Sequence, residues 1–405
     1  MAEFTDREHY IPIRLPDLLD LLCREQLADD DRGKLRSFSC LLAAIFHFEF
    51  HHSLDELKNA YAPFDPDNDV RPLTPWTADE RQHKLNQLYQ QFDALLERAN
   101  YVRLTREKLE AAFEAVSAWG INMEVDFTQF DRLELYYRGD TVGQRIRKNW
   151  RTRWKEQVLD VDIYQRIVMI VKLRATPHTN KLGLNTDAVF IKIFKDIPKA
   201  DLEMLLPGAK LRFSRVDRGK IGLPVFIGSA LLAWQALKAT ILAALGFAAV
   251  ATAGSQALLW GMTVGALGYG YRSYSSYNNT KNIYSLNLTR SLYYQNLDNN
   301  AGVLFRIIDS AEEQECREAL LGYFFLWREP KADGWTAGEL DDHVEAFLQQ
   351  KAKVRVDFEI EDALAKLLRH GLVDATSAGR YRALPISDAL AKLDHTWDNY
   401  FQFNA

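Results

Sequence analysis

The sequence predicts an α+β protein that is anchored in a membrane by a transmembrane hairpin of two helices. Three observations lead to this fold class. Helical hydrophobic spacing dominates the first part of the chain, and strand-like alternation follows it. A long stretch almost without charge then separates these regions from a C-terminal part of mixed pattern. The 405 residues are 47% hydrophobic and 26% charged, which is typical of domains with apolar cores of their own.

Two soluble regions are expected before the uncharged stretch. Residues 1–126 are predicted to be helical, because Thr77–Asn100 and its neighbours place apolar residues on one helical face. Residues 127–220 contain short alternating runs such as Val189–Phe194, with a turn signal at Arg138-Gly-Asp140. This second region is therefore predicted to be α+β with a mostly antiparallel sheet.

Residues 221–272 form the predicted transmembrane hairpin. Before Arg272, the only charged residue of this stretch is Lys238. One span needs about 20 apolar residues, so the stretch is long enough for two, near Ile221–Leu242 and Ala249–Tyr271. Basic residues flank both ends, which predicts an integral membrane protein with both termini on the cytoplasmic side.

The second predicted span carries small residues at every fourth position, including Ala257, Gly261 and Gly265. Such a stripe allows two helix backbones to approach closely. It would pack either against the first helix of the same hairpin or against a second copy of the chain in a homo-oligomer.

A cationic segment precedes the hairpin. If it is a strand, five of its cations share one face, which would contact anionic lipid headgroups of the bilayer. The alternative is a solvated edge strand whose charges block aggregation. The five residues are Arg145, Arg147, Arg151, Arg153 and Lys155.

The C-terminal part is predicted to be a winged-helix-like domain. Residues 273–302 are rich in Asn and Tyr and form a connector, and residues 303–405 follow as the domain. Three helical patterns, the second opened by the capping box Thr336–Glu339, precede a predicted β-hairpin and a last helix. We expect this domain to fold on its own.

Binding of nucleic acid by this domain is not expected. Residues 303–405 contain 12 basic and 19 acidic residues, a net charge of −7. The third helix begins with the acids Glu359, Glu361 and Asp362, which would repel phosphate. Arg380 and Arg382 of the hairpin are instead candidates for contact with a protein partner.

The sequence offers no catalytic or cofactor signature. It contains no HExxH, GxSxG, Walker or CxxC motif. His47 and His51 have zinc-like spacing on a helix, but no third ligand follows at a recognisable distance. No catalytic residue, metal ligand or cofactor is therefore assigned, and whether the chain is an enzyme stays open.

Four stretches resemble an uncharacterised membrane-protein family, domain of unknown function 3754. The resemblance implies a paired-helix membrane anchor with a soluble face and implies no catalytic residues. The absence of an organellar presequence favours a bacterial inner-membrane member. The stretches are Glu8–Arg14, Tyr61–Asp67, Phe194–Gly208, and Tyr293–Asn300 running into Ala311–Glu315.

Two functional hypotheses follow. The first is a membrane-anchored scaffold or regulatory protein that displays its soluble domains to an unknown protein partner. The second is a membrane enzyme or lipid-handling protein with a site at the interface. Residues for that site would be Arg138, Asp140, Lys195, Asp196, Asn296, Asn299 and Asn300.

Overall fold

The computed structural model of the chain describes most of the sequence in segments. Residues 107 and 183 and single residues between 213 and 292 are described as well, but without continuous neighbours. The segments are 3–4, 9–25, 27–70, 72–105, 122–124, 126–148, 156–176, 185–207, 210–212, 293–376 and 379–401.

The chain divides into two compact units. The larger unit contains residues 1–108, 127–199 and 296–405, and the smaller one contains residues 109–126 and 200–295. In the smaller unit, the short strands β3 (Asn122–Glu124) and β7 (Lys210–Arg212) pair antiparallel. All further description concerns the larger unit.

Three helices form the N-terminal part of the larger unit, as the hydrophobic spacing predicts. They are α1 (Leu15–Cys23), α2 (Asp29–Tyr61) and α3 (Ala78–Arg98). The start of α3 is fixed by a capping box, in which the Thr77 side chain accepts from the Glu80 N–H and Glu80 accepts in return.

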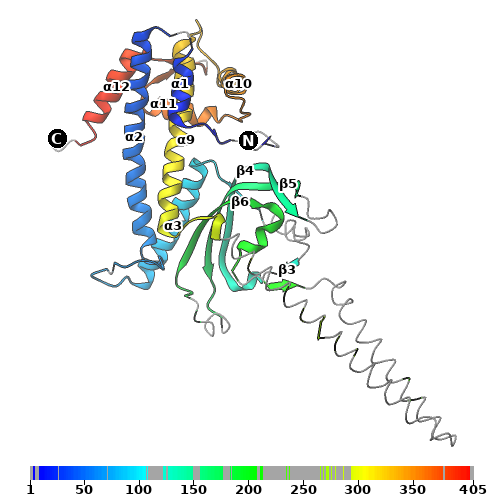
Figure 1. The fold of residues 1–405 in the computed structure, drawn as a ribbon. Coiled ribbons are helices and arrows are strands. Elements are labelled where there is room, and N and C mark those ends of the chain that lie inside the picture. The colour runs from blue at the N-terminus through cyan, green and yellow to red at the C-terminus, as the bar shows by residue number, and fades with distance from the viewer. Residues whose placement is uncertain are drawn as a thin grey trace, which may run out of the picture. The chain divides into compact units, whose positions relative to one another are not determined.

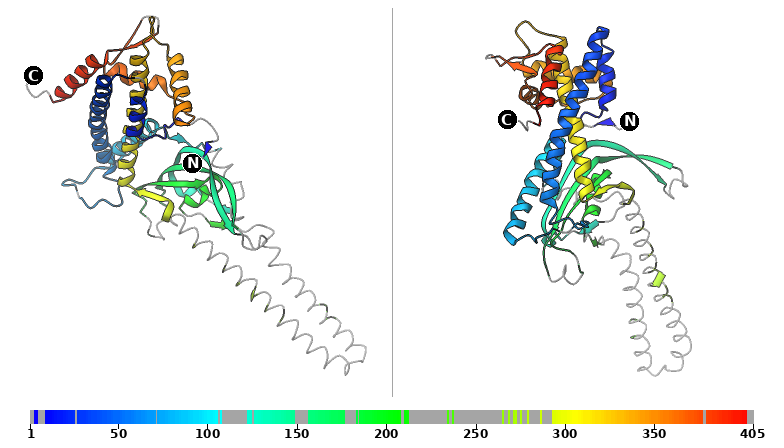
Figure 2. Two further views of the ribbon diagram at one scale, coloured as in Figure 1. Left: turned by 45° about the horizontal axis from the view of Figure 1, so that its top comes forward. Right: turned by 90° about the vertical axis from the view of Figure 1, so that its left-hand side faces the viewer.

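Helix α9 (Ala301–Arg328) is the central element of this unit. It lies beside α2 in the views of Figures 1 and 2, and the rings of Phe38 and Tyr323 stack 4.1 Å apart between them. Every residue from Gln314 to Leu326 is buried. A helical segment that is buried on all sides belongs to the core of the protein.

One antiparallel sheet packs on the first half of α9. Its strands follow the order β1-β4-β5-β6-β8, and β2 pairs with β4 off this path. The predicted antiparallel arrangement is confirmed. The strands are β1 (Glu3–Phe4), β2 (Val102–Arg103), β4 (Phe130–Lys148), β5 (Glu156–Leu173), β6 (Val189–Pro198) and β8 (Asn296–Asn299).

The predicted turn at Arg138–Asp140 is wrong, because β4 continues through it. Gly139 has φ +77°, a value that glycine adopts without steric cost, and pairing with β5 resumes at Asp140 opposite Tyr164. A side chain at this position would meet Gln165 at 2.7 Å. Glycine here accommodates a local irregularity in a long strand and does not end it.

Asn300 links the sheet to α9. It has a left-handed φ of 50°, its N–H donates to the Ile191 carbonyl, and its side-chain oxygen accepts from the Ile191 N–H. Its amide nitrogen also donates to Asp67 at 2.5 Å. The start of α9 is thus held on β6 by one asparagine that uses both its backbone and its side chain.

The C-terminal part has the predicted order of three helices, a hairpin and a last helix. Thr336 and Glu339 form the predicted capping box, and Gly371 ends the third helix with φ +63°. After α9, the elements are α10 (Ala337–Phe347), α11 (Ile360–Arg369), β9 (Val373–Ala375), β10 (Tyr381–Ala383) and α12 (Ile386–Asp398).

The prediction of a transmembrane hairpin is corrected. No helix in the described part of the chain is both long and apolar enough to cross a bilayer. The longest helices, α2 and α9, contain charged residues throughout, whereas a span needs about 20 apolar ones. The predicted integral membrane localisation is corrected on the same finding.

Most of the predicted hairpin lies outside the described residues. Ala257 and Gly261 of the small-residue stripe are among the undescribed positions, and Gly265 is described as helical.

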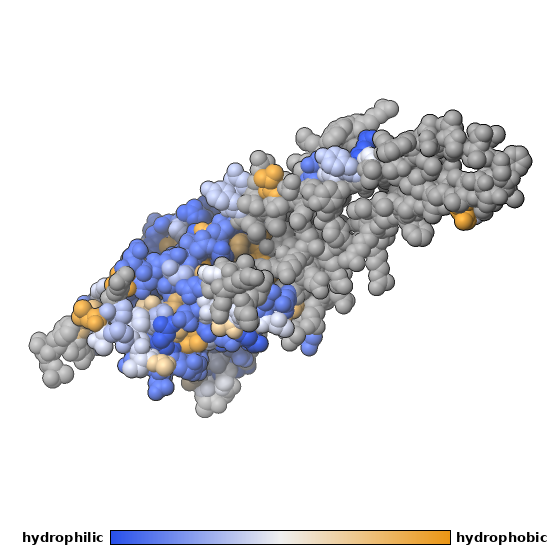
Figure 3. Space-filling model, turned by 90° about the horizontal axis from the view of Figure 1, so that it is seen from below, coloured by the Kyte–Doolittle hydropathy of each residue, from blue (hydrophilic) through white to orange (hydrophobic). Residues whose placement is uncertain are grey.

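On the face shown in Figure 3, hydrophilic residues cover most of the described surface.

The structure changes the expectation that residues 303–405 fold alone. The core cluster of α9 includes Phe38 and Leu42 of α2 and Ile191 of β6, which this fragment lacks. We therefore expect the isolated fragment 301–405 to show no cooperative thermal transition by circular dichroism and to be digested rapidly by protease. The full chain is the control. A cooperative transition in the fragment would show that the C-terminal part has a sufficient core of its own.

Candidate functional site

The middle of α9 carries four polar or charged side chains inside the core. Gln314, Glu315, Arg317 and Glu318 are each at most 2% exposed. Buried polar groups are costly unless they are hydrogen-bonded, and buried charges are costly unless they are paired. The partners of these four residues therefore define the most constrained region of the molecule.

The N-terminal segment, defined here as residues 9–14, lies across α9 and supplies backbone partners. The Gln314 side chain accepts from the Ile11 N–H at 3.2 Å and donates to the His9 carbonyl at 3.3 Å. Arg317 donates to the Ile13 carbonyl at 2.8 Å. Two side chains of one helix therefore fix an extended segment that precedes α1.

Glu315 and Glu318 receive cations from two other helices. Arg98, at the end of α3, donates through Nε to Glu315 at 2.6 Å. Lys366 of α11 donates to Glu318 at 2.9 Å. Gln314 also donates to Glu318 at 2.7 Å. The pairs join α3, α9 and α11 through charges that are largely removed from water.

Lys366 is surrounded by carboxylates. Besides Glu318, its ammonium lies 2.6 Å from Asp362 and 3.8 Å from Glu315. Burial alone would lower the pKa of Lys366, but the three carboxylates outweigh this effect and raise the pKa. Lys366 is therefore the central cation of the cluster.

The next cation of α11 pairs with α2. Arg369 donates to Glu49 at 2.8 Å, and the Tyr400 hydroxyl donates to the other oxygen of Glu49 at 3.2 Å. His370 lies 3.7 Å from Glu49, and burial lowers its pKa despite this carboxylate. The contacts attach the end of α11 to the middle of α2.

These residues line a cleft of about 470 Å³, within the size range of small-molecule sites. Its charged side chains are three cations and three acids, so the formal charges of the lining cancel. The lining residues are Glu49, Ser53, Arg98, Glu315, Asp362, Ala365, Lys366 and Arg369.

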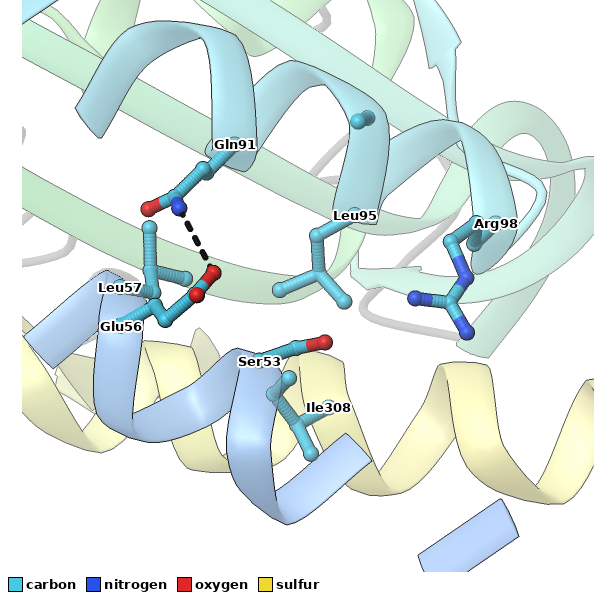
Figure 4. Close-up of a pocket in the computed structure, with 8 residues that line it drawn as sticks. Ser53, Glu56, Leu57, Gln91, Leu95, Arg98 and Ile308 are labelled. Carbon is cyan, nitrogen blue, oxygen red and sulfur yellow. Dashed lines mark hydrogen bonds between the residues drawn. The ribbon is translucent and has the colours of Figure 1, made fainter. Parts of the chain in front are cut away.

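A smaller pocket of about 140 Å³ adjoins the cleft, and Ser53 and Arg98 line both. Figure 4 shows this pocket between α2, α3 and α9, with Gln91 donating to Glu56 at 3.1 Å. The remaining walls are apolar and come from Leu57, Ala94, Leu95 and Ile308.

The structure does not show the predicted cationic segment as one strand. Arg145 and Arg147 lie on β4, opposite Leu159 and Gln157 of β5. Arg151, Arg153 and Lys155 lie outside the described residues. The shared cationic face stays a prediction.

The two hairpin arginines that were candidates for partner contact bind within the chain. Arg380 donates to the Gly334 carbonyl at 2.9 Å and lies 3.8 Å from Glu339. Arg382 donates to the Ala332 carbonyl. Both guanidinium groups thus hold the loop before α10 against the hairpin.

Three residues of the alternative interfacial site have partners elsewhere in the chain. Arg138 is buried, donates to the Ala99 carbonyl and stacks on Tyr10 at 4.0 Å. Asp140 pairs with Lys199 at 2.7 Å, and Asn300 donates to Asp67. The other four residues lie on the paired strands β6 and β8: Lys195, Asp196, Asn296 and Asn299.

The histidine pair has separate partners as well. His47 binds Glu312 of α9 at 3.0 Å, and His51 lies 3.6 Å from Asp55. Among the described residues, no group of three or more His, Cys, Asp or Glu side chains could hold a metal ion.

Sequence reasoning missed the cluster on α9. The signal was the polar run Gln314-Glu-Cys-Arg-Glu318 in a segment, Asp309–Trp327, that the hydrophobic spacing predicts to be an amphipathic helix. Read as one amphipathic face, this run appears solvated. Only the burial of the helix on all sides turns it into a set of charges that need partners.

We expect Lys366→Met to be strongly destabilising. It leaves Glu318 and Glu315 buried with one cation fewer, and breaking a buried pair typically costs about 3–5 kcal/mol. Chemical denaturation of the full chain measures the loss. Lys34→Met, at an exposed pair with Asp30, is the matched control and should change little. Equal effects of the two substitutions would contradict the importance of the cluster.

A second prediction concerns pH. Because the folded pKa of His370 lies below its unfolded value, the unfolded chain binds the proton more tightly. The contribution of His370 to stability is thus present above the unfolded pKa of about 6.5 and is lost as pH falls below it. We expect His370→Gln to flatten the dependence of the melting temperature on pH between about 7 and 5. Parallel curves for the two proteins would refute this.

Comparison with known proteins is limited to one region. Residues 130–302 match the model of a protein family described as "Protein of unknown function (DUF3754)". No solved structure matches the chain. The chain therefore contains an uncharacterised domain of unknown function, which extends from β4 to the start of α9.

Proposed function

We propose that the chain is a regulatory or scaffold protein whose winged-helix-like part contacts other proteins and does not read nucleic acid. One observation carries this proposal. The cations of α11, the helix that would enter a DNA groove, are directed at carboxylates of α2 and α9. In a nucleic-acid reader they would instead be available for phosphate or base edges.

The rest of the surface that would face DNA supports the same view. The two arginines of the β-hairpin are occupied by backbone carbonyls. At the start of α11, Glu361 and Asp362 are exposed, and an acid at this place opposes a phosphate backbone. Neutralisation of several phosphates, on which non-specific binding depends, has few cations to draw on here.

An aromatic patch near the C-terminus is the surface that we assign to a protein partner. Trp397 and Phe401 are 43% and 61% exposed. Phe401 lies edge-on to Phe48 of α2, and the Tyr400 ring also contacts Phe48. Aromatic side chains are enriched in protein interfaces, where they bury much area at low entropic cost. The proposed protein partners include a second copy of the chain.

The resemblance outside residues 130–302 also supports a common architecture. Ile11 and Gln314, which bind each other, lie in two of the resembling stretches. Asp67 and Asn300 also bind each other. Asp67 lies in the stretch Tyr61–Asp67, and Asn300 lies in the last stretch. These stretches therefore meet along α9, as expected if the whole chain follows one family plan.

The test is a titration of the full chain with duplex DNA, followed by fluorescence anisotropy. A salt concentration of about 50 mM gives a strict test, because electrostatic attraction to DNA is screened less at low ionic strength. We expect no salt-sensitive binding. The double variant Arg380→Glu, Arg382→Glu is the control for residual hairpin contacts and should give the same result. Micromolar binding that is lost in this variant would replace the proposal with a nucleic-acid-binding function.

A further inference from the structure

Arg98 has unused hydrogen-bonding capacity inside the cleft. Its Nε donates to Glu315, and its guanidinium plane lies 4.0 Å from the centroid of the Phe50 ring. Among the described residues, its two terminal Nη groups have no hydrogen-bond partner. An arginine held in this way presents a planar pair of donors, the geometry that binds a carboxylate through two bonds.

The surroundings of Arg98 disfavour a ligand with net charge. Three cations and three acids line the cleft, and each cation contacts one of these acids: Arg98 contacts Glu315, Lys366 contacts Asp362 and Arg369 contacts Glu49. A bare anion would add an unbalanced charge to a partly desolvated site. A zwitterion adds none, because its carboxylate meets Arg98 while its ammonium meets the cleft acids Glu49 and Asp362.

The adjoining pocket fits an aromatic ring. Its volume is about 140 Å³, and an apolar cavity of about 150 Å³ is known to accept benzene. In Figure 4, Leu57, Leu95 and Ile308 surround it, and Arg98 and the Ser53 hydroxyl stand together at one end. A ligand that spans both spaces thus has its charged atoms beside its ring.

We propose that the cleft and the adjoining pocket bind an aromatic α-amino acid. The carboxylate binds the Nη groups of Arg98, and the ammonium binds the cleft acids. The ring fills the pocket. This inference goes beyond the proposed function and does not depend on it, because neither the hairpin nor the aromatic patch takes part.

The experiment is isothermal titration calorimetry of the full chain with L-tyrosine. We expect saturable binding with a dissociation constant in the micromolar to millimolar range. Three analogues remove one feature each: tyrosinamide lacks the carboxylate, N-acetyltyrosine lacks the ammonium, and L-alanine lacks the ring. Each should bind about tenfold more weakly or worse, because each leaves a buried protein group unpaired or a pocket unfilled. Absence of binding by L-tyrosine, or equal binding by tyrosinamide, would overturn the proposal.

Two variants locate the site. Arg98→Lys keeps the charge beside Glu315 but removes the planar fork, so L-tyrosine should bind about tenfold more weakly. Ala94→Trp fills the pocket from its exposed rim and should abolish binding without changing the core. Arg36→Lys, at an exposed pair with Asp20, is the matched control and should bind as the natural chain does.

The two variants also separate a structural effect from a loss of the site. The melting temperature of each unliganded variant shows whether it folds. If Arg98→Lys proves unstable, Ala94→Trp decides, because it alters no ion pair. Unchanged binding by a folded Ala94→Trp protein would overturn the assignment of the pocket.

Discussion

The burial of charged side chains on α9 is the constraint on which the rest of the larger unit depends. Residues Gln314–Leu326 of α9 are covered on all sides, so Glu315, Arg317 and Glu318 have no face where they could reach water. Leaving such a charge unpaired costs on the order of several kcal/mol, which is comparable to the free energy of unfolding of a whole domain. Each of these residues therefore requires a partner from elsewhere in the chain.

Those partners come from segments that lie far apart in the sequence. The N-terminal segment, the end of α3 and the middle of α11 all converge on four residues of one helix. This convergence explains why residues 1–108 and 296–405 belong to one compact unit, although more than 180 residues of chain separate them. Ionic and hydrogen-bonding groups fix the geometry here, and the apolar cluster around them supplies the driving force.

The same constraint sets the role of the winged-helix-like part. In an isolated domain of this order, α11 would present one face to solvent. Here that face carries Lys366 and Arg369, and both are used to neutralise buried or half-buried acids of α9 and α2. These two cations thereby hold α11 against α9 and α2, and the charge-balanced cleft lies beside them. The ion pairs that the buried acids of α9 require thus also form the cleft for which we propose ligand binding.

The sequence by itself determined the local structure of this protein. Hydrophobic spacing predicted α1 to α3, a capping box predicted the start of α10, and alternation predicted an antiparallel sheet, because these signals act over a few neighbouring residues. Only the tertiary structure decided that the second half of α9 is buried on all sides, that Arg380 and Arg382 bind carbonyls, and that Gly139 lies within a strand. The cleft also depends on the tertiary structure, because its charged residues come from four helices. No local sequence pattern predicts how these helices pack to bring together Glu49, Arg98, Glu315 and Lys366. Paired charges of this kind appear as ordinary surface residues in a sequence, because their partners are specified by long-range packing and not by spacing.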